Sequence, residues 1–103
     1  MADLELTRGR EQAGVRPVLV VSMNPFNSGP AGLVVMVPST TTERRVSWHV
    51  RVDPPEGGLR ERSFLMCENL RSIAKKRLMR RWGAVSGGTM AAVEDRLRIL
   101  LEL

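Results

Sequence analysis

Short apolar runs separated by turn-forming residues occupy the first two thirds of the chain. Segments 17–22, 32–37 and 63–67 are rich in Val, Leu and other apolar residues, which is typical of buried strands. The stretches 23–31 and 53–58 contain the prolines and glycines that favour turns. This pattern predicts a mainly β protein built from short strands.

Segment 46–52 differs from these runs because apolar and polar positions alternate along it. One face of the extended chain would carry Trp48 and two valines, and the other would carry His49 between Ser47 and Arg51. The alternation predicts a strand with one buried and one polar face.

The region that follows is less regular. We expect 68–73 to extend the preceding strand or bend away from it, and the basic segment 75–81 to form a helical turn. Residues 83–85 then have the composition of a short closing strand.

Helical spacing appears near the C-terminus. Ser86 has the side chain of an N-cap, and the apolar positions after it form one stripe, made up of Met90, Val93, Leu97, Leu100 and Leu101. The simplest interpretation is a helix that packs on the sheet, and a partner-binding helix is the alternative. The whole pattern predicts a single domain over 1–103, a small curled antiparallel sheet or barrel with a C-terminal helix.

Composition narrows the class of protein. The chain has 103 residues, 43% of them hydrophobic, which argues against disorder, and no apolar run approaches the roughly 18 residues of a membrane span. The acidic first residues do not resemble a signal peptide. The net charge of +5 suits a nucleic acid or an acidic partner, although it also suits a protein that is merely basic.

Several chemistries are excluded by residue counts. One cysteine and one histidine cannot form an internal disulfide, a zinc site from those side chains or a two-histidine ribonuclease site, and the free cysteine fits a reducing, cytoplasmic location. The chain has no P-loop and no G-x-S-x-G elbow. Its acidic residues are scattered, so a two-metal nuclease is disfavoured and we expect no metal and no cofactor.

An arginine at a strand boundary is the main candidate for chemistry. Pro17 suits the first residue of a strand, which places Arg16 where a glycine-containing loop meets the sheet. Threonines 40–42 follow the next predicted strand. A guanidinium fork and a hydroxyl donor together could stabilise the negative charge of a phosphodiester transition state.

Six segments occur in the order and at the spacing of a known family, and together they resemble the MazF/PemK toxin endoribonucleases. They are Asp3-Leu4 with Thr7-Arg8-Gly9, Glu11-Gln12-Ala13-Gly14-Val15-Arg16-Pro17-Val18, the Asn-containing turn at 24–29, Val37-Pro38-Ser39-Thr40-Thr41, Glu68-Asn69-Leu70-Arg71-Ser72-Ile73, and 78–86 with the final helix.

The resemblance implies an SH3-like barrel of the kind shared by MazF, PemK and CcdB, and a homodimer. It also implies cleavage of single-stranded RNA at a short motif, without a metal, through the substrate's 2′-OH to give a 2′,3′-cyclic phosphate and a 5′-hydroxyl. As a type II toxin the protein would be neutralised by a cognate antitoxin with an acidic tail.

The family's functional positions can be carried onto this sequence. Arg16 and Thr40 take the catalytic roles. The residues expected at the RNA site are Glu11, Gln12, Thr41, Glu68 and Asn69. Because an arginine does not readily give up its proton, we expect Arg16 to act electrostatically, and the general base stays open.

Other residues allow two interpretations each. Glu68 could be a solvated carboxylate, and His49 could contact RNA or simply lie on a polar strand face. Trp48 and Trp82 suit a core or dimer contact, or stacking on a base. Cys67 suits a small buried apolar residue. The basic run at 75–81 is either a solvated face or a phosphate-binding one.

Two departures from the family pattern affect the fold. The chain opens inside the family's first strand, so that strand could be short, and Ser39 stands where an apolar Ile is common. Two alternative functions remain, a toxin of the same fold that binds DNA gyrase and an RNA binder that does not cut. The gyrase class lacks the Arg16 and Thr40 pair and depends on its C-terminal residues, whereas this chain keeps the pair.

Overall fold

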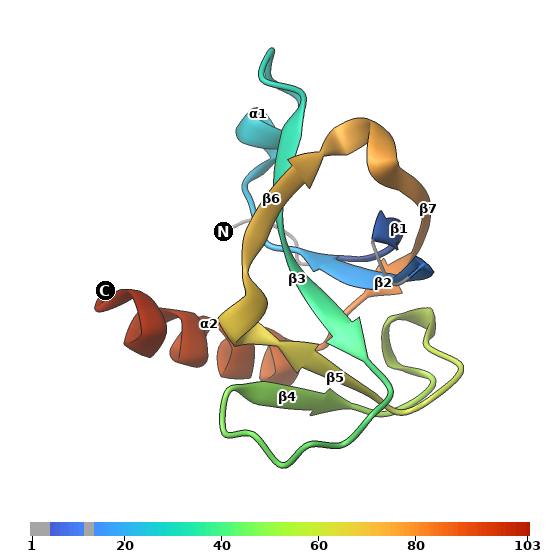
Figure 1. The fold of residues 1–103 in the computed structure, drawn as a ribbon, viewed down its shortest axis with the longest axis vertical. Helices are drawn as coiled ribbons and strands as arrows, with labels where there is room; N and C mark the ends of the chain where they lie inside the picture. The colour runs from blue at the N-terminus through green and yellow to red at the C-terminus, as the bar shows by residue number, and fades with distance from the viewer. Residues whose placement is uncertain (1–4, 12–13) are drawn as a thin grey trace.

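The computed structural model describes residues 5–11 and 14–103. Within these ranges the chain forms seven strands, two α-helices and three single 3₁₀ turns (Figure 1). The strands are β1 (Glu5–Glu11), β2 (Gly14–Val20), β3 (Leu33–Thr40), β4 (His49–Val52), β5 (Ser63–Met66), β6 (Arg71–Ala74) and β7 (Leu78–Ala84). The helices are α1 (Asn24–Asn27) and α2 (Gly87–Leu101), and the 3₁₀ turns are Glu56–Gly58, Cys67–Asn69 and Lys75–Arg77.

All seven strands join one antiparallel sheet in the order β4-β5-β3-β2-β1-β7, with β6 paired to the first half of β3. The long strand β3 is central, because it contacts β2, β5 and β6 along its length (Figure 1). Among the described residues no ladder joins β4 to β7, so the sheet curls without closing. The predicted class, a small mainly β antiparallel fold with a C-terminal helix, is confirmed.

The sheet is buried on both faces at its centre. Leu19 and Val37 belong to one core cluster, whereas Val18 and Met36, their neighbours in sequence, belong to a second cluster on the opposite face. Residues of β6 and β7 pack against the second cluster. Because successive side chains of a strand point to opposite faces, two buried faces produce the continuous apolar runs seen in the sequence.

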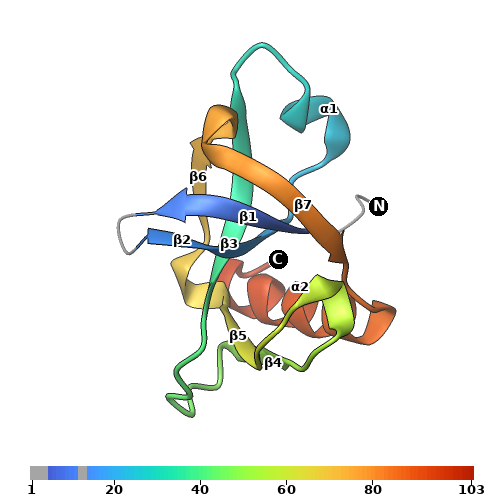
Figure 2. The ribbon, with the colours of Figure 1, turned by 90° about the vertical axis from the view of Figure 1, so that its right-hand side faces the viewer.

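Helix α2 covers the first cluster, and Figure 2 shows it lying across the sheet beside β4 and β5. Ser86 is its N-cap, with the Thr89 N–H donating to Ser86 Oγ at 3.2 Å, as predicted. Val93 is fully buried, and Met90, Leu97 and Leu100 pack around it. Leu101 is 52% exposed, so the predicted stripe ends one residue early. In the described ranges no helix is both long and apolar enough to cross a bilayer.

Two predicted strand boundaries at the candidate site were wrong. Strand β2 begins at Gly14 rather than Pro17, because it forms a hairpin with β1 in which Glu11 pairs with Gly14. Strand β3 does not end at Pro38. Pro38 pairs with Val18 of β2, and the next two residues, up to Thr40, pair with β5 on the other edge of β3. Strand β1 is seven residues long within the described chain, which answers the concern that it is short.

The prediction for 46–52 was partly wrong. Only His49–Val52 form a strand, because the preceding residues form a turn in which the His49 N–H donates to the Val46 carbonyl at 3.0 Å. His49 and Val50 are both buried, so the expected polar face is absent at His49. The expected helical turn at 75–81 is a single 3₁₀ turn over Lys75–Arg77, and β7 follows it at once.

Candidate functional site

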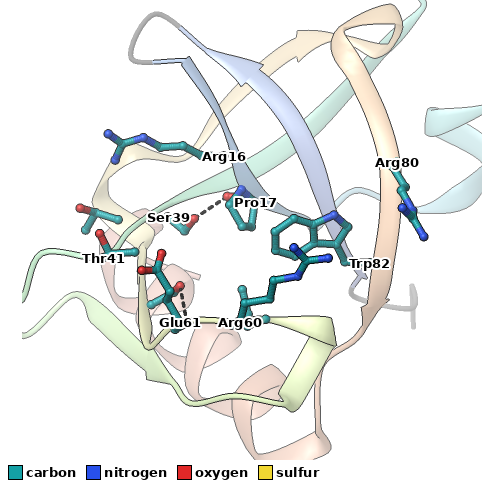
Figure 3. A pocket seen from close by; sticks show the side chains of 11 residues that line it. Arg16, Pro17, Ser39, Thr41, Arg60, Glu61, Arg80 and Trp82 are labelled. Carbon is teal, nitrogen blue, oxygen red and sulfur yellow. Dashed lines mark hydrogen bonds between the residues drawn. The ribbon is translucent and has the colours of Figure 1, made fainter.

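A pocket of about 470 Å³ opens where β2 begins and β3 ends (Figure 3). The two strands contribute Arg16, Pro17, Ser39 and Thr40 to its lining, and Thr41 follows directly. This volume is in the range of small-molecule sites in proteins, which start at roughly 300 Å³.

Strand register brings Arg16 and Thr40 together. Val18 of β2 lies opposite Pro38 of β3 in an antiparallel ladder. This is the last pair of the ladder, and Arg16 and Thr40 each lie two residues beyond it, on the face of Val18 and Pro38, because the side-chain period of a strand is two. Both residues line the pocket. Arg16 as a whole is half-buried and Thr40 is 5% exposed, so the sheet fixes the backbone from which both side chains start.

The Thr40 hydroxyl is oriented by its own backbone. The Thr42 N–H donates to Thr40 Oγ1 at 3.2 Å, which occupies one acceptor position of that oxygen. A hydroxyl also carries one proton that it can donate. The Thr40 proton is therefore available to an oxygen bound in the pocket.

The contacts of Ser39 explain why a polar residue can stand where the family commonly has an apolar Ile. The Ser39 side chain is 3% exposed, and its hydroxyl donates to the backbone carbonyl of Pro17. This bond crosses from β3 to β2 beside Arg16 and Thr40 (Figure 3). A polar residue is tolerated at this buried position because its hydrogen bond is satisfied, and the bond fastens the two strand ends that carry the site.

A loop and β7 form the rest of the pocket. The loop contributes Leu59, Arg60 and Glu61, β5 contributes Ser63, and β7 contributes Arg80 and Trp82. Figure 3 shows Arg16, Thr41 and Glu61 on one side of the pocket and Trp82 and Arg80 on the other.

Glycines seat this loop against β7. Gly58 has φ of +78°, and a Cβ added there would lie 2.6 Å from the Trp82 carbonyl oxygen. A Cβ on Gly83 would lie 3.1 Å from the Gly57 carbonyl carbon. Only glycine allows backbones to approach this closely, so these positions fix the distance between the loop and Trp82.

A carboxylate ties the same loop to helix α2. Glu56 Oε2 accepts a hydrogen bond from the Thr89 hydroxyl and another from the Ser86 N–H, the latter at 3.0 Å. Partial burial disfavours the charged form of Glu56, but the bonds from Thr89 and Ser86 outweigh it and lower its pKa. The start of α2 thus holds the loop in place.

The sequence did not place the lining residues of this loop, of β5 or of β7 at the site. Arg60 and Glu61 lie in a turn-rich segment that carried no motif. Arg80 was part of the basic run, and Trp82 was considered only for a core or dimer contact or for base stacking. No local sequence pattern predicts their place in the site, because they come together only when the loop packs against β7.

The other residues expected at the RNA site are distributed differently. Thr41 lines the pocket. Glu11 is the last residue of β1, and Gln12 lies outside the described residues. Glu68 and Asn69 belong to the Cys67–Asn69 turn, which does not line this pocket.

Glu68 instead pairs with His49. His49 Nε2 lies 2.8 Å from Glu68 Oε2, and the side chains are 4% and 32% exposed. His49 Nδ1 is buried without a hydrogen-bond partner in the described structure. The histidine therefore faces the interior rather than solvent, which corrects the polar strand face expected from the alternation.

Cys67 is buried beside this pair, as predicted for a small apolar residue. Burial raises the pKa of its thiol to about 11. A thiol with that pKa is protonated at neutral pH, so it has little nucleophilic character.

The side chains that line the pocket suit a ligand that carries both a negative charge and an aromatic ring. Arg16, Arg60 and Arg80 line the pocket, and Glu61 is the one carboxylate that lines it among the described residues. Fixed cations favour a phosphate, and Trp82 offers an aromatic face. Within the described part of the chain no three His, Cys, Asp or Glu side chains gather into a metal-binding group.

Comparison with known proteins agrees with the fold. A solved structure of the Mycobacterium tuberculosis toxin MazF-mt6 is 24% identical, with a TM-score of 0.83 over 96% of this chain and 97% of that one. A Deinococcus radiodurans MazE-MazF structure is 22% identical, with a TM-score of 0.83 over 100% and 96%. At these identities the likeness shows a shared fold.

Another solved structure is an endoribonuclease from a mycobacterial species in complex with its cognate antitoxin. It is 27% identical, with a TM-score of 0.82 over 100% of this chain and 95% of that one. A family model for the PemK-like, MazF-like toxin of type II toxin-antitoxin systems matches residues 1–101. Because that match spans nearly the whole sequence, this protein belongs to the PemK-like, MazF-like toxin family.

Proposed function

We propose that this protein is an endoribonuclease toxin that cleaves single-stranded RNA at selected sequences in the cytoplasm, without a metal ion. The observation that carries the proposal is the pocket at the ends of β2 and β3, which both Arg16 and Thr40 line together with two further arginines. Family membership supports it, because the mycobacterial relative in its antitoxin complex is described as an endoribonuclease.

Arg16 and Thr40 both stabilise the same transition state. The Arg16 fork binds the non-bridging phosphate oxygens in bidentate fashion, and the Thr40 proton is donated to one of them. Negative charge on these oxygens grows as phosphorus becomes pentacoordinate, so both contacts strengthen during the reaction. The sheet fixes the backbone of both residues, which reduces the reorganisation needed.

The nucleophile is the 2′-OH of the substrate. Its attack on the adjacent phosphorus gives a 2′,3′-cyclic phosphate on one fragment and a 5′-hydroxyl on the other. DNA lacks this hydroxyl and is not cleaved. Thr41 contacts RNA within the pocket, and Glu11, Gln12, Glu68 and Asn69 are further RNA contacts.

The partners follow from the same family. The relatives include structures of a toxin with its cognate antitoxin and of MazE with MazF. We infer that this chain, with a net charge of +5, binds a cognate antitoxin through an acidic tail and acts as a homodimer.

Mapping the 5′ ends of a long RNA tests the proposal. Full-length protein is incubated with the RNA in EDTA, alongside Arg16→Ala, Thr40→Ala and the matched control Arg51→Ala. Arg51 is exposed, pairs with Asp53 and lies outside the pocket. Discrete cuts by the wild type and the control, absent from both pocket variants, are expected. Intact RNA together with stalled DNA gyrase would show the alternative, a gyrase-directed toxin.

A further inference from the structure

The pocket contains one group whose role is unassigned, the side chain of Glu61. A carboxylate opposes phosphate binding by charge, so its presence among three pocket arginines needs a reason. Figure 3 shows the side chain rising from its loop into the pocket on the side of Ser39 and Thr41, whereas Arg60 of the same loop runs toward Trp82. Glu61 therefore shares the half of the pocket that holds the reacting phosphate.

Cleavage through a 2′-OH requires a group that takes its proton, and the described residues that line the pocket offer one candidate. A guanidinium is effectively always protonated, so Arg16 is not that group. His49 is buried and paired with Glu68 away from the pocket. Cys67 is buried outside it and protonated at neutral pH. Among the described lining residues, Glu61 is the one carboxylate, a kind of side chain that can act as a general base.

The loop holds Glu61 in a defined place. The Ser63 hydroxyl donates to the Glu61 backbone carbonyl at 3.1 Å, which fixes the backbone next to β5. The glycine contacts with β7 and the Glu56 bonds to α2 hold the loop on its other side. In the described structure the carboxylate has no hydrogen-bond partner of its own, so its oxygens are free to accept. The charged residues that line the pocket with it are Arg16 from β2, Arg60 from its own loop and Arg80 from β7, of which Arg80 lies on the far side beyond Trp82 (Figure 3).

We propose that Glu61 is the general base of the RNA cleavage, an inference that rests on the function proposed above. Its carboxylate removes the proton of the 2′-OH as the 2′ oxygen bonds to the adjacent phosphorus. The bond from phosphorus to the 5′ oxygen breaks with its electron pair on that oxygen, which takes a proton from water. Glu61 then returns its own proton to solvent.

Single-turnover kinetics of Glu61→Gln test this role. The substitution keeps the shape of an exposed side chain, so we expect an unchanged fold by circular dichroism. We expect the cleavage rate constant to fall about 100-fold or more, the usual range for removing a general base. The decline of rate on the acid side, which reports protonation of the base in the wild type, should vanish. Asp95→Asn, on the exposed face of α2, should match the wild type.

Binding is measured with the same RNA carrying a 2′-deoxy sugar at the cut site, which prevents cleavage. Glu61→Gln should bind it about as tightly as the wild type, since a base acts on the barrier rather than on affinity. A rate constant within about threefold of the wild type, or a loss explained by weaker binding, would overturn the inference. Undiminished cleavage at shifted sites would also overturn it, by showing that Glu61 reads a base. If the wild type itself leaves RNA intact, the proposed function fails first.

Discussion

Replacing Thr40 by valine separates catalysis from stability at the candidate site. Valine keeps the shape of this side chain, which is 5% exposed, and removes only the hydroxyl. That hydroxyl accepts one hydrogen bond, from the Thr42 N–H at 3.2 Å, and Thr42 is exposed enough to bond to water instead. The net stability cost is therefore at the lower end of the usual range, about 0.5–1 kcal/mol.

The catalytic cost is larger, because the hydroxyl proton would stabilise charge that exists only in the transition state. Removing one such donor usually lowers the rate about 10²–10³-fold, or roughly 2.7–4 kcal/mol. We expect Thr40→Val to lose about this much in single-turnover RNA cleavage. A Tm lower by about 2–8 °C corresponds to the smaller stability term.

Thr40→Ser is the matched variant, because it keeps the hydroxyl and removes a buried methyl group. It should lose more stability than activity, the reverse of Thr40→Val. Two results would refute the reasoning. One is cleavage by Thr40→Val within about fivefold of the wild type. The other is an activity loss in both variants that is fully accounted for by the fraction of unfolded protein.

Three further substitutions test the site and its support. Arg16→Lys should lose most cleavage activity with Tm unchanged, because an ammonium cannot reproduce the bidentate fork; cleavage near the wild-type rate would contradict the proposed phosphate contact. Gly58→Ala should lower Tm and activity together, since its Cβ would lie 2.6 Å from the Trp82 carbonyl oxygen at a φ of +78°. Gly87→Ala, whose Cβ meets nothing within 4 Å, is its control, and equal Tm values would count against the seated loop. The pKa of Glu56 is lowered on folding, so its stabilisation is present at neutral pH and lost as pH falls below about 4.5; Glu56→Gln should flatten that acid loss in thermal melts, and an unchanged slope would contradict it.

The sequence predicted the fold class and the catalytic pair for different reasons. Continuous apolar runs predicted β2 and β3, because both faces of these strands are buried, and helical spacing predicted α2 through the stripe around Val93. Arg16 and Thr40 became a pair only through the family resemblance, since composition and spacing do not give strand register. The ladder from Val18 to Pro38 supplies the physical reason for that pairing.

Other features depend on contacts that no local pattern contains. His49 alternated as a polar position, yet it is buried because Glu68, from a separate turn, supplies a hydrogen-bond partner. Arg60 and Glu61 enter the pocket because Gly58 allows their loop to approach Trp82. Pro17 suggested a strand start, but hairpin pairing with β1 extends β2 past it.

The most direct test of the central claim is the chemistry of the RNA fragments. RNA is incubated in EDTA with the wild type or with Arg16→Ala, and fragment masses are measured. We predict wild-type fragments that end in a 2′,3′-cyclic phosphate and start with a 5′-hydroxyl, and none of them from Arg16→Ala. Intact RNA with the wild type, or the same fragments at the same rate from Arg16→Ala, would contradict the assignment of this pocket to RNA cleavage.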